Sequence, residues 1–218
     1  MINVAREFVR GFRRLHFVGP CVTVFGSARS EEADPSYVMA KEVARRLGSS
    51  GFSIMTGGGP GIMEAANRGA REVGATSIGC TIELPQEQAS NPYLDLEIPF
   101  DHFFVRKVML VKYSYGFVVM EGGFGTGDEM FEALTLIQTG KIANFPVVLM
   151  GSEFWGDLLA QIDTMRDEHT IATGDTDLLC VTDDPEIAAN HIHSVALERF
   201  GLSEHLRPLR LLGERRRL

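Results

Sequence analysis

The sequence predicts an α/β protein with a Rossmann-like, doubly wound and mainly parallel sheet that carries helices on both faces. Short apolar runs rich in Val and Ile alternate along the chain with segments whose apolar residues recur at helical spacing. These runs show no polar alternation, which is typical of strands buried on both faces. A chain of 218 residues with 44% hydrophobic residues fits one such domain, so we expect a single domain over residues 1–218.

The expected elements follow in order. Residues 1–18 are predicted to form an amphipathic helix, because Val4, Phe8 and Phe12 recur at helical spacing with arginines between them. Beyond it we expect strands at 21–25, 52–55, 76–82, 117–120, 146–150 and 178–181, and helices at 35–49, 62–73, 101–113, 129–140, 154–168 and 185–200. The proline-containing stretch 83–99 is expected to be a loop with a short strand around 96–98. Residues 207–218 are expected to form a basic C-terminal tail.

The charge of the chain is distributed unevenly. The net charge is −8, but the first 14 and last 12 residues hold nine of the 21 basic residues and two of the 29 acidic ones. The body between them therefore has a net charge of −15, which argues against a nucleic-acid partner. No apolar stretch reaches the roughly 18 residues of a membrane span, and no signal-peptide pattern is present. Three widely spaced cysteines are typical of free thiols, so we expect a cytoplasmic protein.

The stretch 120–129, Met-Glu-Gly-Gly-Phe-Gly-Thr-Gly-Asp-Glu, joins a predicted buried strand to a predicted helix. We expect a tight turn from its four glycines, Gly122, Gly123, Gly125 and Gly127. Such a turn presents backbone N–H groups at a helix N-terminus, where phosphate binds readily, and Thr126 can add a hydroxyl donor. The first helical turn then carries two carboxylates, Asp128 and Glu129, which are either helix-start charges or groups for chemistry on a phosphorylated substrate.

A second glycine turn, residues 57–61, follows the strand expected at 52–55. The carboxyl ends of parallel strands meet at one edge of the sheet, so the two turns are expected to converge on one ligand site. The sequence lacks the Gly-Lys-Ser/Thr of a P-loop, and its first strand is not followed by Gly-x-Gly-x-x-Gly. A nicotinamide cofactor and pyridoxal phosphate are both disfavoured, and no metal-ligand spacing stands out, so we expect no cofactor and no metal.

Three motifs carry a resemblance to a known family. Residues 57–67, Gly-Gly-Gly-Pro-Gly-Ile-Met-Glu-Ala-Ala-Asn, resemble the first signature of the LOG family, the cytokinin riboside 5′-monophosphate phosphoribohydrolases long taken for lysine decarboxylases. Residues 121–129 resemble its second signature, Pro-Gly-Gly-x-Gly-Thr-x-x-Glu, except that Glu121 replaces the proline. The pair Arg106-Lys107 matches the Arg-Lys pair of the family on the preceding helix, and the resemblance spans about residues 22–159.

The resemblance implies hydrolysis of the N-glycosidic bond of AMP or of a cytokinin riboside 5′-monophosphate, a cytokinin-activating reaction that yields free base and ribose 5-phosphate. By this resemblance Glu129 stabilises the oxocarbenium-like state and activates water, and Arg106 binds the nucleotide and helps to set the charge at the reaction centre. His102 is left out of the catalytic set. The resemblance also implies that the active site lies at a dimer interface, so we expect a homodimer or larger homo-oligomer. The expected substrate-binding residues are Lys107, Gly58, Gly59, Gly61, Gly122, Gly123, Phe124, Gly125, Thr126, Gly127, Asp128, Thr135 and Glu87.

A rival interpretation is a non-catalytic protein of the same fold that binds or carries a nucleotide or the molybdenum cofactor. Glu121 favours it, because a glutamate adds negative charge beside a phosphate site. The combination of Glu129 with Arg106 favours the enzyme, because a pure binder has no evident need for a carboxylate near a phosphate. A single-strand DNA binder of similar fold is disfavoured by the acidic body.

Overall fold

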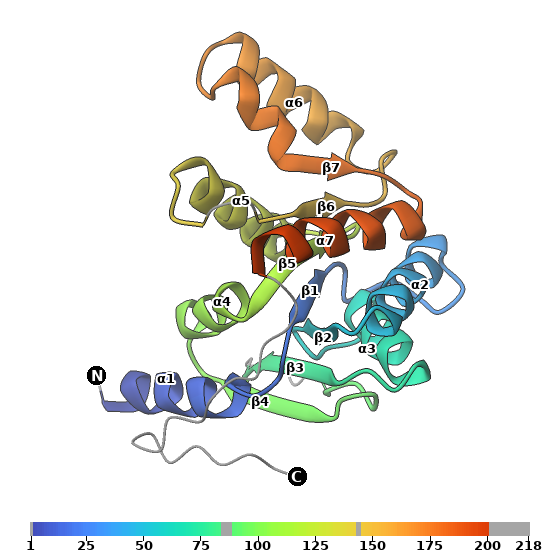
Figure 1. Cartoon of the computed structure of the whole chain (residues 1–218), viewed down its shortest axis with the longest axis vertical. Coiled ribbons are helices and arrows are strands. Elements are labelled where there is room, and N and C mark those ends of the chain that lie inside the picture. Colours follow the sequence, from blue (N-terminus) through green and yellow to red (C-terminus); the bar gives the residue numbers. More distant parts are fainter. Residues whose placement is uncertain (1, 84–88, 143–144, 201–218) are drawn as a thin grey trace.

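The computed structural model describes residues 2–83, 89–142 and 145–200, and a single seven-stranded sheet runs through them. All neighbouring strands are parallel, and their order is β4-β3-β2-β1-β5-β6-β7 (Figure 1). The Rossmann-like α/β class is confirmed, and the sheet is parallel throughout. The strands are β1 (Cys21–Phe25), β2 (Ser53–Thr56), β3 (Ser77–Ile82), β4 (Leu96–Phe100), β5 (Ser114–Val119), β6 (Val147–Leu149) and β7 (Leu179–Val181).

Eight helices connect and cover these strands in the described part of the chain. They are α1 (Ile2–Leu15), α2 (Pro35–Ser49), α3 (Ile62–Glu72), α4 (Phe103–Lys112), α5 (Phe124–Gln138), α6 (Gly156–Asp167), the 3₁₀ helix η1 (Thr173–Leu178) and α7 (Pro185–Phe200). Each expected strand and helix is present within a few residues of its expected bounds. The main differences concern α5 and β4.

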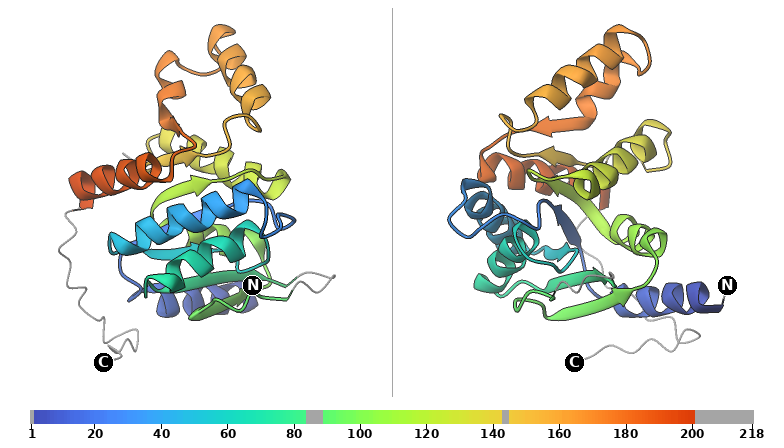
Figure 2. Two further views of the ribbon diagram at one scale, coloured as in Figure 1. Left: turned by 90° about the vertical axis from the view of Figure 1, so that its right-hand side faces the viewer. Right: turned by 180° about the vertical axis from the view of Figure 1, so that it is seen from behind.

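The sheet separates two hydrophobic cores, and helices lie on both of its faces (Figure 2). Alternate residues of each strand point to opposite faces, so Val22 and Val24 of β1 belong to one core, and Cys21 and Phe25 to the other. The first core is covered by α2, α3 and α7, and the second by α1, α4 and α5. Helices on both faces explain why the strands are apolar on both sides.

The strand order reverses at β1, which lies between β2 and β5. The chain builds the sheet outward from β1 to β4, and then returns to add β5 on the other side of β1. In open parallel sheets, ligands bind beyond the carboxyl ends of the strands at this reversal. The two glycine stretches follow β2 and β5, so both begin beside the switch point.

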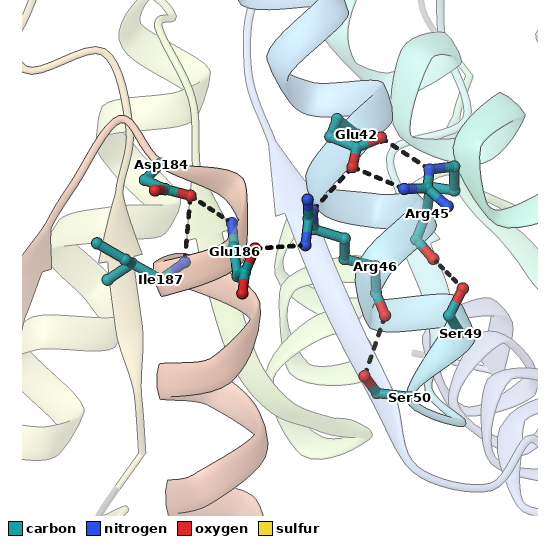
Figure 3. Close-up of polar contacts among 8 residues, drawn as sticks. All are labelled: Glu42, Arg45, Arg46, Ser49, Ser50, Asp184, Glu186 and Ile187. Carbon is teal, nitrogen blue, oxygen red and sulfur yellow. Dashed lines mark hydrogen bonds and ion pairs between the residues drawn. The ribbon is translucent and has the colours of Figure 1, made fainter.

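The last described helix, α7, packs beside α2 on the first core (Figure 3). Asp184 accepts a hydrogen bond at 2.7 Å from the backbone N–H of Glu186, which satisfies a free donor at the start of α7. The Glu186 carboxylate pairs with Arg46 of α2 at 3.1 Å, and Arg46 also pairs with Glu42 at 2.8 Å. These contacts hold α7, the last helix of the described chain, against α2.

The sequence placed the start of α5 incorrectly. The expected helix began at residue 129, and the glycines before it were expected to form a turn; instead α5 begins at Phe124 and includes Gly125 and Gly127. Glycine disfavours helix by about 1 kcal/mol relative to alanine, which is why the pattern suggested a turn. Tertiary packing overrides that preference, because Met130 and Ala133 of this helix are buried in the second core.

Strand β4 also extends further than expected, through Pro99 to Phe100. Proline lacks the N–H that a central strand requires, but β4 is the edge strand of the sheet. The expected basic tail 207–218 lies outside the described residues, as does Glu87. No helix in the described ranges is long and apolar enough to cross a membrane.

Candidate functional site

The loop after β1 holds the two glycine stretches together. The backbone N–H of Ser27 donates to the carbonyl oxygen of Glu121 at 2.9 Å, at the start of the second stretch. The N–H of Ile62, at the end of the first stretch, donates to the carbonyl oxygen of Ser27, also at 2.9 Å. Gly61 has a φ of 67°, and a Cβ on it would overlap the Ser27 carbonyl oxygen. The two stretches therefore converge at the switch point, as the sequence predicted.

A buried network of hydrogen bonds centred on the amide of Asn67 supports the first glycine stretch. The side chain of Asn67 in α3 is fully buried; its oxygen accepts from Thr56 at 2.7 Å and from the Asn91 amide at 3.0 Å. Its nitrogen donates to Ser77 at 2.8 Å and to the Ile78 carbonyl oxygen at 3.3 Å. All the hydrogen-bonding positions of this amide are thus used.

Asn91 completes the fastening of this stretch. Its N–H donates to the carbonyl oxygen of Gly58 at 2.9 Å, and its side-chain amide donates to that of Gly59 at 3.0 Å. Sequence reasoning missed Asn91, which lies in the stretch expected to be irregular. The one local signal for Asn67 was its place within the first motif. These contacts set the backbone of Gly58 and Gly59, and Gly58 itself adopts a φ of 75°.

The second glycine stretch forms the exposed N-terminus of α5. Space is open around Gly123, Gly125 and Gly127, where an added Cβ would meet no atom within 4 Å. Phe124 is fully exposed. The first intrahelical backbone bond joins the N–H of Gly127 to the carbonyl oxygen of Gly123 at 3.0 Å, so the N–H groups before it have no partner within the helix. An exposed helix N-terminus of this kind can bind an anion.

Glu129 lies one turn into α5 and is only 3% exposed. Its Oε1 is 3.7 Å from Nη2 of Arg106, and its Oε2 has no hydrogen-bond partner among the described residues. Burial raises the pKa of this carboxyl to about 7; the positive charges of Arg106 and Lys107 lower it, but not enough to offset the loss of hydration. Glu129 is therefore a carboxyl group that can exchange a proton near neutral pH.

Arg106 projects from α4 between the two glycine stretches. A Cβ on Gly57 would lie 3.3 Å from its Nη1, while its Nη2 faces Glu129. Its guanidinium carbon lies 5.6 Å from the ring centroid of Phe103, which is compatible with a cation–π contact. Its Nε is buried without a hydrogen-bond partner in the described structure. Arg106 thus places a cation within reach of the first glycine stretch and of Glu129.

Lys107 links α4 to the outer side of α5. Its Nζ lies 2.9 Å from Oδ2 of Asp128 and 2.8 Å from Oε2 of Glu132. Burial lowers the pKa of Lys107, but its hydrogen bonds to Glu132 and Asp128 outweigh this effect, so the pKa is raised and the side chain is charged at neutral pH. The pair of ion pairs holds the two helices side by side, and it was not expected from the sequence.

The other expected site residues occupy different positions. Thr126 is buried against Gly122, so its hydroxyl lies beneath the stretch. Thr135 is exposed further along α5, and its hydroxyl donates to the carbonyl oxygen of Phe131 at 2.8 Å. The Glu121 side chain extends toward Gly151 at the end of β6, where a Cβ on that glycine would be 3.0 Å from Oε1 of Glu121.

The chain was compared with known proteins. A family model described as "Possible lysine decarboxylase" matches residues 63–192, which is more than half of the chain. The chain is 30% identical over 167 residues to cytokinin riboside 5′-monophosphate phosphoribohydrolase LOG of Oryza sativa subsp. japonica, covering 74% of this chain and 67% of that protein. It is 28% identical over 179 residues to the Rhodococcoides fascians protein named cytokinin riboside 5′-monophosphate phosphoribohydrolase, covering 79% and 89%.

A further relative is longer than this chain. The pyrimidine/purine nucleotide 5′-monophosphate nucleosidase of Escherichia coli K12 is 28% identical over 174 residues, which cover 74% of this chain but 38% of that protein. The chain therefore spans well under half the length of this relative.

Solved structures share the fold. The Moco carrier protein of Chlamydomonas reinhardtii has a TM-score of 0.60 and 25% identity, with 83% of this chain and 99% of that chain covered. The molybdenum cofactor binding protein of Rippkaea orientalis has a TM-score of 0.61 and 24% identity, with 81% and 97% covered. From the match to the family model, supported by the LOG-named relatives, the chain belongs to the LOG family, whose model carries the lysine decarboxylase description.

Proposed function

We propose that this protein is a nucleoside 5′-monophosphate phosphoribohydrolase acting on AMP or a cytokinin riboside 5′-monophosphate. The observation that carries the proposal is a buried carboxyl, Glu129, with a pKa of about 7 and an arginine 3.7 Å away, one turn inside an open helix N-terminus. This combination offers an acid–base group beside an anion site. The nucleotide names of the relatives support the same substrate class.

In the proposed reaction, water is added across the N-glycosidic bond. The open N–H groups at the start of α5 bind the 5′-phosphate, which positions the ribose through binding energy remote from the reacting carbon. The Glu129 carboxylate takes a proton from water, whose oxygen forms a bond to C1′ as the C1′–N bond breaks. The bonding electron pair leaves with the base, which takes up a proton from solvent to become the free base, and Glu129 releases to solvent the proton that it took from water. The products are the base and ribose 5-phosphate.

Positive charge has two roles in this scheme. Arg106 contacts the nucleotide. Its positive charge also lowers the pKa of Glu129 and so opposes the effect of burial, which keeps part of the Glu129 population ionised near pH 7. Lys107 holds Asp128 and Glu132 away from the phosphate by ion-pairing with both. The backbones of Gly58, Gly59 and Gly61 bind the rest of the nucleotide. By resemblance alone, Thr135 and Glu87 are proposed as further substrate contacts.

A second candidate function is that of a non-catalytic carrier of a nucleotide or the molybdenum cofactor. Two observations favour it: the likeness to a Moco carrier protein at 25% identity, and Glu121 in place of the motif proline. Glu121 adds a negative charge to the residue that precedes the second glycine stretch, although its side chain extends toward Gly151. We rank this function second, because a binder of anions gains nothing from the buried Glu129.

We also propose that the chain works in the cytoplasm as one α/β domain and as a homodimer or larger homo-oligomer. One sheet takes strands from residues 21–181, which supports the single domain. Large apolar side chains exposed on the site helices support an assembly: Phe103, Phe104 and Val108 on α4, and Phe124 and Phe131 on α5.

The test is release of free base from AMP and from isopentenyladenosine monophosphate, with nucleotide binding measured in parallel. Glu129→Gln keeps the size of the side chain but cannot take up a proton, so it should bind nucleotide and lose base release by at least a hundredfold. The exposed Glu31 provides a matched control, and Glu31→Gln should retain activity. Tight binding of either nucleotide with no base release by the wild type would reject the enzyme in favour of the carrier.

A further inference from the structure

The N-terminal helix α1 supplies a capping carboxylate to the start of the site helix α4. His102, the residue before α4, makes no side-chain cap of its own. Instead, Oε2 of Glu7 accepts hydrogen bonds from the backbone N–H groups of Asp101 at 3.2 Å and His102 at 3.3 Å. Glu7 is only 4% exposed although it lies among arginines in sequence. A carboxylate at a helix N-terminus also interacts favourably with the helix dipole.

The imidazole of His102 holds this carboxylate in place. Its Nδ1 lies 2.7 Å from Oε1 of Glu7. Burial raises the pKa of Glu7, but the hydrogen bonds from the His102 side chain and the two backbone N–H groups outweigh that effect, and the pKa is lowered. Glu7, Asp101 and His102 also bring ligand-type atoms within 4.8 Å of one another. Both oxygens of Glu7 already accept hydrogen bonds, so the cluster serves as a helix cap without requiring an ion.

Other contacts hold α1 along α4 and the edge strand. A Cβ on Gly11 would lie 2.8 Å from the sulfur of Met109, so the two helices approach closely at this point. At the far end of α4, the hydroxyl of Tyr113 donates to the carbonyl oxygen of Phe12 at 3.3 Å. On the other side of α1, Arg10 donates to the carbonyl oxygen of Pro99 in β4. Helix α1 lies beside β4 and α4 in Figure 1.

The cap is one turn from the proposed catalytic arginine. The backbone N–H of Arg106 donates to the carbonyl oxygen of His102 at 3.2 Å, so the position of His102 sets the first turn from which Arg106 extends. We propose that Glu7 is a positioning residue, which holds Arg106 opposite Glu129 by capping α4 from another helix. This inference rests on the proposed function of the Arg106–Glu129 site. By this inference α1 contributes to the site, although it lies far from α4 in the sequence.

The first test asks whether Glu7 acts through Arg106. Glu7→Ala removes the acceptor of two backbone N–H groups at the start of α4, so it should lower kcat for AMP roughly tenfold while KM changes less. Glu7→Gln, which keeps an oxygen acceptor, should retain more activity than Glu7→Ala. In an Arg106→Ala background, Glu7→Ala should cause less than a twofold further loss. If Glu7→Ala lowered kcat by the same factor in the Arg106→Ala background as in the wild type, the proposal would be overturned. Arg13→Ala, exposed on the same helix, is the control.

The second test needs no substrate. Amide hydrogen exchange at Val105 and Arg106 should accelerate roughly tenfold in Glu7→Ala, whereas Val118 in β5 should remain protected. Unchanged exchange in α4, or acceleration spread equally over the sheet, would overturn the positioning role. Absence of base release by the wild type would instead reject the proposed function, and exchange would still decide whether Glu7 holds α4.

Discussion

At the scale of single residues, Glu129 combines two properties that a solvent-exposed carboxyl group would not show together. It is a carboxyl group close to two cations, yet its pKa is raised, because its burial outweighs their attraction. Arg106 is too far away, at 3.7 Å, to replace the lost hydration with a hydrogen bond. The poor solvation makes this carboxylate a stronger base than an exposed one.

The first prediction concerns the pH dependence of the proposed reaction. Only the deprotonated form of Glu129 can take a proton from water. kcat/KM for AMP should therefore rise with pH, with a midpoint near 7, and level off above it. Initial rates from pH 5 to 9 measure this profile. A midpoint near 4.5, the ordinary value for a glutamate, would show that Glu129 is not the group that limits the reaction.

The same raised pKa predicts a change in stability. The folded protein binds this proton more tightly than the unfolded chain, so the favourable contribution is complete below about pH 4.5 and is lost as the pH rises to about 7. Glu129→Gln should therefore gain roughly 1–3 kcal/mol over the wild type at pH 8, and nearly nothing at pH 4.5. Urea denaturation at the two pH values measures the difference. An equal effect at both would contradict the raised pKa.

A third prediction tests the close approach at the second glycine stretch. A Cβ at Gly122 would overlap the side chain of Thr126, which is buried beneath it. Gly122→Ala should displace the first turn of α5 and weaken AMP binding at least tenfold, as measured by calorimetry. Gly156→Ala is the matched control, because an added Cβ at the start of α6 meets no atom within 4 Å. Equal affinities of the two variants would contradict the account.

At the scale of elements, the sequence predicted well what depends on local pattern. Apolar runs identified six of the seven strands, and β4 was expected only as a short strand in an irregular stretch. The motif around Glu129 marked a candidate site that also includes Arg106, because α4 and α5 flank β5 on one face of the sheet. The start of α5 was predicted wrongly, because glycine propensity favours a turn, whereas the packing of Met130 and Ala133 in the second core is tertiary. Glu7 looked like one acid in a basic helix, since its partners lie more than 90 residues away.

The buried amide network is the clearest contact that the sequence could not reveal. Asn67 joins α3 to the ends of β2 and β3 and to Asn91. These residues lie in separate segments, so no local sequence pattern predicts their contacts. Asn67→Ala removes both halves of the amide, so that three buried side chains, Thr56, Ser77 and Asn91, each lose one hydrogen bond. The loss of a buried network of this kind costs roughly 2–4 kcal/mol in free energy of unfolding.

Chemical denaturation would measure this loss, with the exposed Asn190 of α7 as the matched site. Asn190→Ala should change stability by less than about 0.5 kcal/mol. We also expect Asn67→Ala to weaken nucleotide binding, because the Gly58 and Gly59 backbones lose the support of Asn91. A variant that keeps full stability would mean that water replaces the amide.

At the scale of the whole molecule, acidic and basic side chains are segregated. The segment 153–186, with α6 and β7 at one edge of the sheet, contains ten acidic residues and one arginine (Figure 1). The arginine-bearing α1 lies at the opposite edge, beside β4. The site helices between these edges carry exposed aromatic side chains instead. Exposed aromatic side chains of this kind suit contact with a second copy.

The final prediction tests association through the site helices. Phe131 on α5 is 40% exposed and Phe154, before α6, is 53% exposed, so the two offer a matched comparison. If a second copy covers α4 and α5, Phe131→Glu buries a charge at the interface and should shift the protein toward monomer by at least tenfold in dissociation constant, whereas Phe154→Glu should not. Sedimentation equilibrium measures both. A wild-type monomer at high concentration would reject the dimer, and equal dissociation of the two variants would place the interface elsewhere. Loss of base release together with dissociation would further indicate that the partner copy completes the site beside Glu129.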